Sequence, residues 1–273
     1  MSRGLLRSTN DGKHTETMEQ QHETKVIVVA AQKGGVGKTT TTGHLAGTTA
    51  EVFPPLPIAG TGEQQAQVLA VSTDPQGSLP YWLEKVEKRL AEQGERLPLD
   101  YAQEHKNPRV LAKLKQARQY RRIFVDSPGW LEGADDELAA LRRGEAPEQP
   151  GKQILLATLE SADFVVVPME PEDLAFPPTQ RTIEEVIQPL GIRFVVVINN
   201  WDPRDGDGDL VDTRKRCERR GWPVARTVIR RYKLHTTASA AGRLCTHYPR
   251  NRTAVEAQKD YLSLNMELAI GGN

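Results

Sequence analysis

The chain of 273 residues is poor in cysteine, in aromatic side chains and in long apolar runs. Cys217 and Cys245 are its only cysteines, which excludes a disulfide framework, a CxxC redox pair and a four-cysteine metal site within one chain. The longest apolar runs, Val26–Ala31 and Phe194–Ile198, hold about half a dozen residues, far fewer than a membrane span needs. Met1–Lys25 is polar and lacks the apolar stretch of a signal peptide. These absences predict a soluble cytoplasmic protein.

Net charge is absent as well, since 36 Lys and Arg residues balance 36 Asp and Glu residues. The balance conceals a local excess between Val211 and Arg252, where twelve Lys and Arg residues face only Asp212 and Glu218. Such a basic block is an electrostatic footprint for polyanions. A solvated helical face with scattered arginines would give the same composition. Because few aromatic residues interleave, contact with duplex phosphates is favoured over base stacking.

Short β-branched runs alternate with helix-compatible stretches from residue 25 onward. This alternation predicts an α/β fold with a doubly wound, mostly parallel sheet. The expected strands are 25–31, 68–73, 122–126, 164–168, 193–198 and 224–229. The expected helices are 38–50, 79–93, 137–141 with 153–160, 179–188, 210–220 and 253–268. We expect residues 1–24 to be a flexible tail, residues 25–273 a single domain, and segments 52–67 and 141–151 inserted surface loops.

A glycine-rich phosphate-binding motif follows the first expected strand and opens the next helix. Its glycines let backbone N–H groups surround phosphate oxygens. Lys38 brings a positive charge to the β- and γ-phosphates, and the Thr39 hydroxyl suits Mg²⁺. Gln32 stands where the general P-loop form has its first glycine. The expected nucleotide-binding residues are Lys33, Gly34, Gly35, Val36, Gly37, Lys38, Thr39 and Thr40.

The run KGGVGKTT resembles the deviant Walker A motif of the ParA/MinD family of P-loop ATPases. Asp74-Pro75-Gln76-Gly77 is similar to the family's segment after the second strand, and Arg122–Gly129 is similar to its Walker B strand. The resemblance extends from residue 25 to about 268, and Trp82 favours the ParA-type partitioning branch. It implies an ATPase that uses ATP and Mg²⁺, with Lys33 reaching across a sandwich homodimer to the partner's phosphates.

Carboxylates near the expected phosphate site complete the catalytic machinery. Asp126, at the end of a buried strand, is suited to hold a Mg²⁺-bound water beside Thr39. Asp74 leaves the second strand where a carboxylate can orient the attacking water, so we expect Lys33, Lys38 and Asp74 to be catalytic. Ser72 stands where the family commonly carries another acid, which implies slow hydrolysis.

A purine site is expected after the fifth strand, at the edge where open α/β sheets bind ligands. The segment Asn199–Arg204 resembles the family's Asn-containing purine loop. An asparagine amide offers the adenine edge both a donor and an acceptor. The sequence does not decide between Asn199 and Asn200.

The resemblance implies a partition ATPase whose ATP dimer binds nonspecific double-stranded DNA of the nucleoid. A ParB-like centromere-binding adaptor would stimulate its hydrolysis. Arg230, Arg231 and Lys233 are the expected DNA contacts, because they lie between a strand and the next helix. Two alternatives stay open: a ParA-like ATPase that positions protein clusters, and a non-hydrolysing ATP-dependent DNA-binding scaffold. No membrane partner is expected, since the C-terminal helix has no cationic face.

Overall fold

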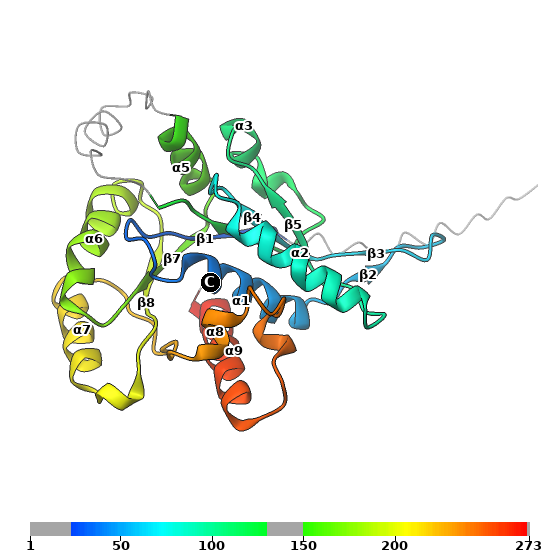
Figure 1. Cartoon of the computed structure of the whole chain (residues 1–273). Coiled ribbons are helices and arrows are strands. Elements are labelled where there is room, and N and C mark those ends of the chain that lie inside the picture. Colours follow the sequence, from blue (N-terminus) through cyan, green and yellow to red (C-terminus); the bar gives the residue numbers. More distant parts are fainter. Residues whose placement is uncertain (1–22, 130–149, 272–273) are drawn as a thin grey trace, which may run out of the picture.

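The computed structural model of the chain describes residues 23–129 and 150–271. A parallel sheet of six strands lies at its centre, in the order β5-β4-β6-β1-β7-β8 (Figure 1). The expected α/β fold with a parallel sheet is therefore confirmed. Its strands are β1 (Lys25–Val29), β4 (Val68–Ser72), β5 (Asp100–Gln103), β6 (Arg122–Asp126), β7 (Phe164–Met169) and β8 (Phe194–Ile198).

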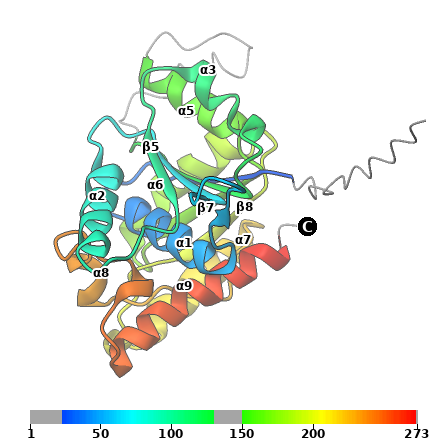
Figure 2. The same cartoon turned by 90° about the vertical axis from the view of Figure 1, so that its right-hand side faces the viewer.

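Helices cover both faces of this sheet, which explains why its strands are apolar on both sides (Figures 1 and 2). One face packs against α1 (Lys38–Val52), α2 (Ser78–Ala91) and α9 (Arg252–Gly271). The other packs against α3 (Pro108–Leu111), α5 (Pro150–Glu160), α6 (Phe176–Gln180), a π-helical stretch Arg181–Ile187 and α7 (Gly208–Arg219). The short helix α8 (Lys233–Thr237) contacts α9.

The strand expected at 224–229 is not formed, and this expectation was wrong. The segment runs beside β8, to which the backbone N–H groups of Ala225 and Ile229 donate, but it forms only isolated bridges (Val196 to Val224 and Trp201 to Arg230) and no continuous ladder. The reason lies in α9, because the Glu267 carboxylate accepts the backbone N–H groups of residues 226 and 227 at 2.6 and 2.9 Å. The Thr227 N–H, which lies between the β8-bonded N–H groups of Ala225 and Ile229 in the alternation, is thus bonded to a helix side chain and the ladder is interrupted.

Other expectations were wrong or concern residues outside the described ranges. The loop expected at 52–67 contains a small hairpin of β2 (Leu56–Pro57) and β3 (Gln64–Gln65), while β5, α3 and α8 were not expected at all. Residues 1–22, 137–141 and 142–149 lie outside the described residues, and so do the expectations for them.

Cys217 and Cys245 are buried free thiols. In the described ranges no helix is long and apolar enough to cross a membrane.

The parallel arrangement gathers the functional candidates at one edge of the sheet. The glycine-rich loop follows β1, Asp74 follows β4, Asp126 ends β6 and Asn199 follows β8. Because parallel strands present their carboxyl ends on the same side, these segments converge there.

Candidate nucleotide site

The loop between β1 and α1 has the backbone geometry of a phosphate cradle. Gly35 and Gly37 adopt left-handed conformations, with φ of 78° and 86°. Gly37 directly precedes α1, so the first N–H groups of the helix face the loop. A Cβ at this position would lie 2.4 Å from Asn199 Nδ2. Glycine is therefore required at residue 37 both by its backbone angles and by the close approach of Asn199.

Lys38 is the buried cation of this site. Its Nζ donates to the carbonyl oxygen of Lys33 at 3.1 Å, which turns the side chain back over the loop. Burial lowers the pKa of Lys38, and the charges of Asp126 and Asp74 partly offset that effect. The ammonium group is thus held at the loop by one carbonyl oxygen, where it can also bind a phosphate.

Asp126 and Thr39 form a direct contact between the Walker B strand and the start of α1. The Thr39 hydroxyl donates to Asp126 Oδ2 at 2.8 Å. The other carboxylate oxygen, Oδ1, is buried and has no hydrogen-bond partner among the described residues. Burial raises the pKa of Asp126 to about 7, an effect that the Thr39 bond and the Lys38 charge oppose. An orphaned carboxylate oxygen beside a hydroxyl is a donor set that fits Mg²⁺, which would neutralise phosphate charge when bound.

The acids and hydroxyls at the end of β4 lie next to this pair. Ser72 pairs with Asp126 in the sheet register, is fully buried, and its Oγ has no partner in the described part of the chain. Asp74 is half-buried, and its Oδ1 accepts the backbone N–H of Gln76 at 2.9 Å. This turn fixes the Asp74 carboxylate near the phosphate loop.

Lys33 does not point freely into solvent. Its Nζ donates to Glu170 Oε2 at 2.9 Å and also to Glu172, both of which follow β7. Burial lowers the pKa of Lys33, but the hydrogen bonds and charges of the two glutamates outweigh it and the pKa is raised. The positive charge of Lys33 is therefore compensated by two acids of its own chain. Sequence reasoning missed both glutamates, although acids directly after a parallel strand are a signal that would have found them.

The two asparagines after β8 have different partners. Asn199 is buried and its Nδ2 donates to the carbonyl oxygen of Val36 at 2.7 Å. Asn200 has φ of 62°, and its Nδ2 donates to Glu170 Oε1 at 2.8 Å. Asn199 thus supports the phosphate loop, while Asn200 holds the glutamate that binds Lys33.

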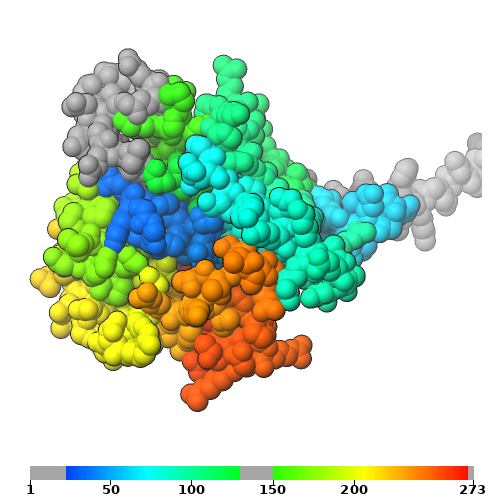
Figure 3. Space-filling model, in the orientation of Figure 1, coloured from blue at the N-terminus to red at the C-terminus, as the bar shows by residue number. Residues whose placement is uncertain are grey.

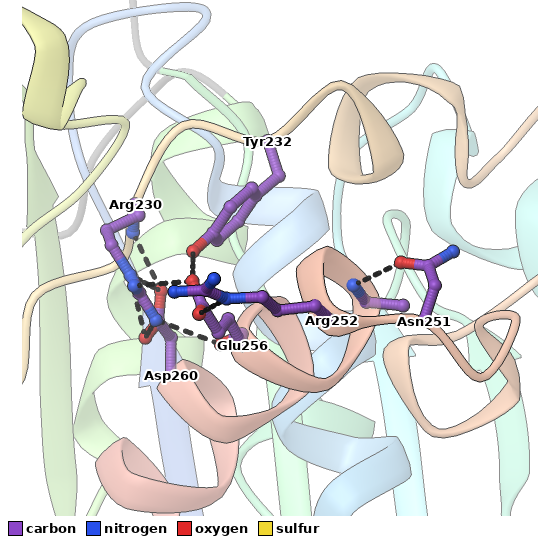
Figure 4. Close-up of polar contacts among 7 residues, drawn as sticks. Arg230, Tyr232, Asn251, Arg252, Glu256 and Asp260 are labelled. Carbon is purple, nitrogen blue, oxygen red and sulfur yellow. Dashed lines mark hydrogen bonds and ion pairs between the residues drawn. The ribbon is translucent and has the colours of Figure 1, made fainter.

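Arg230, one of the expected DNA contacts, is engaged by acids of its own chain. Its guanidinium donates to Asp260 and to Glu256 on α9, and its backbone N–H also donates to Asp260 (Figure 4). The side chain is only 24% exposed. Arg230 therefore anchors its loop to α9, and we assign it a structural role because its charge is already paired. Arg231 and Lys233 are exposed, with no ion pair among the residues in the described ranges.

Comparison with known proteins agrees with this geometry. The chain is 31% identical over 244 residues to "Maintenance of carboxysome distribution protein A" of Gloeobacter kilaueensis, covering 89% of this chain and 94% of the relative. The chain belongs to the ParA/MinD family of deviant Walker A ATPases. No family model matches the sequence.

Solved structures share the fold at lower sequence identity. The MinD cell division protein of Aquifex aeolicus is 16% identical, with a TM-score of 0.61 over 90% of this chain and 97% of that one. The complex of a Cyanothece McdA variant with ATP is 18% identical, with a TM-score of 0.59 over 91% and 97%. Family membership makes this chain an ATPase that uses ATP with Mg²⁺. The scaffold alternative, which has no hydrolysis, is therefore set aside.

Proposed function

We propose that this ATPase positions a protein assembly inside the cell, the alternative to DNA partition in the sequence analysis. The observation that carries the proposal is the 31% identity, over nearly the whole of both chains, to a protein named for the distribution of carboxysomes. The cargo of that relative is an intracellular body, whereas plasmid or chromosome partition finds no comparable support. The cargo of this chain would be of the same kind.

The proposed cycle depends on a change of partner by Lys33. In the single chain its ammonium group binds Glu170 and Glu172. We infer that in an ATP-bound homodimer Lys33 instead reaches the partner's phosphates, so that these two ion pairs break. Charge-assisted hydrogen bonds to phosphate oxygens would replace those that Lys33 makes to the two glutamates.

The proposed catalytic roles follow the contacts already described. Lys38 and the backbone of Gly34–Thr40 would hold the phosphates, and Thr39 with Asp126 would hold Mg²⁺. Asp74 would position the attacking water, since its carboxylate lies at the carboxyl end of β4 beside Asp126. We also infer that residues 25–273 act as one ATPase domain, because β1 and α9 pack into the same layered structure.

Nonspecific DNA of the nucleoid would serve as the track for this cycle. Arg231 and Lys233 are the proposed contacts, since both are exposed and neither forms an ion pair in the described part of the chain. Adenine would be read near Asn199, whose Oδ1 is not used by the contact with Val36. An adaptor on the cargo would stimulate hydrolysis and release the dimer from DNA.

Deleting the gene in its source organism tests protein cargo against DNA cargo. Clustered or unevenly distributed protein compartments, with normal inheritance of plasmids and chromosome, would support the proposal. Loss of plasmids or cells without chromosomes, with unchanged compartments, would refute it in favour of partition. A strain carrying Asp74→Ala gives a matched control, because the protein remains present while the cycle stalls.

A further inference from the structure

A second basic segment lies outside the block between Val211 and Arg252. Residues 105–125 contain seven Lys and Arg residues and no acid. Three of them have local partners: Lys115 pairs with Asp163, while Arg121 and Arg122 lie half-buried beside Phe53. The other four are exposed, and no ion pair or side-chain hydrogen bond engages them within residues 23–129 and 150–271. These four, with the exposed Val110, form what we term the α3 surface: Lys106, Arg109, Lys113 and Arg118.

The backbone under the α3 surface is fixed. Asn107 begins α3, and its Oδ1 accepts the backbone N–H of Arg109 at 3.1 Å. Leu111 and Leu114 point the other way and are buried in the core with α5. The cationic side chains therefore project from an ordered platform, which reduces the entropy lost when a partner binds.

Acids close to this platform are already engaged. Glu104 Oε1 accepts the backbone N–H groups of Lys106 and Asn107 at 3.0 and 2.9 Å. Asp100 Oδ2 accepts the Tyr120 hydroxyl at 2.7 Å. Neither carboxylate pairs with the four exposed cations, so none of these cations has its charge compensated by an ion pair within residues 23–129 and 150–271.

The α3 surface is remote from the proposed DNA contacts. The segment runs from the carboxyl edge of the sheet after β5 back to the amino edge before β6, a span of about 17 Å for a five-residue strand. α3 packs on the face of the sheet opposite to α9, against which α8 packs. In Figures 1 and 2, α3 lies at the top of the molecule and α8 and α9 at the bottom. The α3 surface and the segment around α8 therefore lie at opposite ends of the molecule.

The partner of this surface is indicated by Val110. Its side chain is 46% exposed between Arg109 and Lys113. Phosphate contact makes no use of an exposed apolar side chain, whereas a polypeptide can place an apolar residue on it. The space-filling view shows the α3 region standing out from the body of the molecule (Figure 3). We propose that the α3 surface binds an extended acidic polypeptide segment that carries an apolar residue. This inference does not depend on the proposed cargo or on nucleotide.

Fluorescence anisotropy with a defined probe tests the proposal. The probe is a fluorescein-labelled peptide of about twelve residues, rich in Glu and Asp with one central Leu. We expect the full-length protein to bind it without nucleotide, and R109E/K113E to lower the affinity at least about tenfold. The matched control K215E/R250E removes two exposed cations elsewhere and should change the affinity less than about twofold. Wild-type ATP hydrolysis in every variant shows that each one is folded.

Three results would overturn the proposal. Equal peptide affinity in R109E/K113E and in the wild type would show that the surface is not the site. A loss in R109E/K113E of binding to a duplex of about 20 base pairs, without loss of peptide binding, would make it a nucleic-acid surface. A peptide with Ser in place of Leu should bind more weakly, and the Val110→Asp variant should bind the Leu peptide more weakly. If either affinity is unchanged, the apolar contact on which the choice of partner rests does not exist.

Discussion

Replacing Arg230 by Ala should destabilise the fold, because this arginine is bound within the chain. Its Nη2 lies 2.8 Å from Asp260 Oδ1 and its Nε 3.0 Å from Asp260 Oδ2, while the Asp260 side chain is only 10% exposed. Removing the cation leaves a nearly buried carboxylate with one remaining donor, the backbone N–H of residue 230 at 3.1 Å. Breaking a fully buried pair costs about 3–5 kcal/mol, and partial exposure of Arg230 reduces the expected loss to about 2–3 kcal/mol.

Urea unfolding of the nucleotide-free protein measures this loss, with thermal unfolding as a second readout. A loss of about 2–3 kcal/mol corresponds to a fall in Tm of about 5–10 °C for a chain of this size. Arg231→Ala is the matched control and should change the free energy of unfolding by less than about 0.5 kcal/mol. Combining Arg230→Ala with Asp260→Asn should cost much less than the sum of the single changes. Wild-type stability of Arg230→Ala, together with lost DNA binding, would refute the structural role and restore Arg230 as a DNA contact.

Four further outcomes are expected. The raised pKa of Asp126, about 7 against 3.8, means that the folded nucleotide-free protein keeps a proton which the unfolded chain releases, so stability falls as pH rises from about 4 to 7. Asp126→Asn should remove this dependence of stability on pH and raise the free energy of unfolding at pH 8 by about 2–4 kcal/mol. It should also abolish Mg²⁺-dependent hydrolysis. If urea unfolding of the variant shows the same pH dependence as the wild type, the raised pKa of Asp126 is contradicted. Gly43→Ala should lose about 1–3 kcal/mol, because a Cβ there would lie 2.5 Å from the Trp82 ring, and an unchanged unfolding midpoint would disprove this packing. Lys33→Ala should bind ATP as a monomer and fail to dimerise, so a catalytically active dimer in sedimentation would exclude the cross-subunit role. Arg231→Ala should flatten the slope of log affinity for duplex DNA against log salt by about 2 units per dimer, and only when ATP is present. A slope equal to that of the wild type would exclude Arg231 as a phosphate contact.

Local sequence determined the strands and the phosphate loop. β-branched runs such as Arg122–Asp126 form strands because both faces of a parallel sheet are buried, and the same residues appear as β6. The Gly-Lys-Thr sequence defines the start of α1 at Lys38, since glycine permits the left-handed turn and threonine follows at the first helical turn. Asp126 at the end of its strand was placed correctly for the same reason: a strand of known direction fixes where its last side chain lies.

Tertiary structure decided which charged side chains remain available. In the sequence Arg230 and Arg231 are equivalent members of the basic block. In the structure Asp260, thirty positions further along the chain, pairs with Arg230 and not with Arg231. The glutamates that hold Lys33 follow β7, a position that marks them as site candidates, but only the packing shows that they pair with Lys33. The expected strand at 224–229 is interrupted because Glu267 of α9 accepts the Thr227 N–H in the middle of the segment. Ion pairs and capping bonds between distant segments depend on how helices pack against the sheet, and this packing is a property of the whole fold.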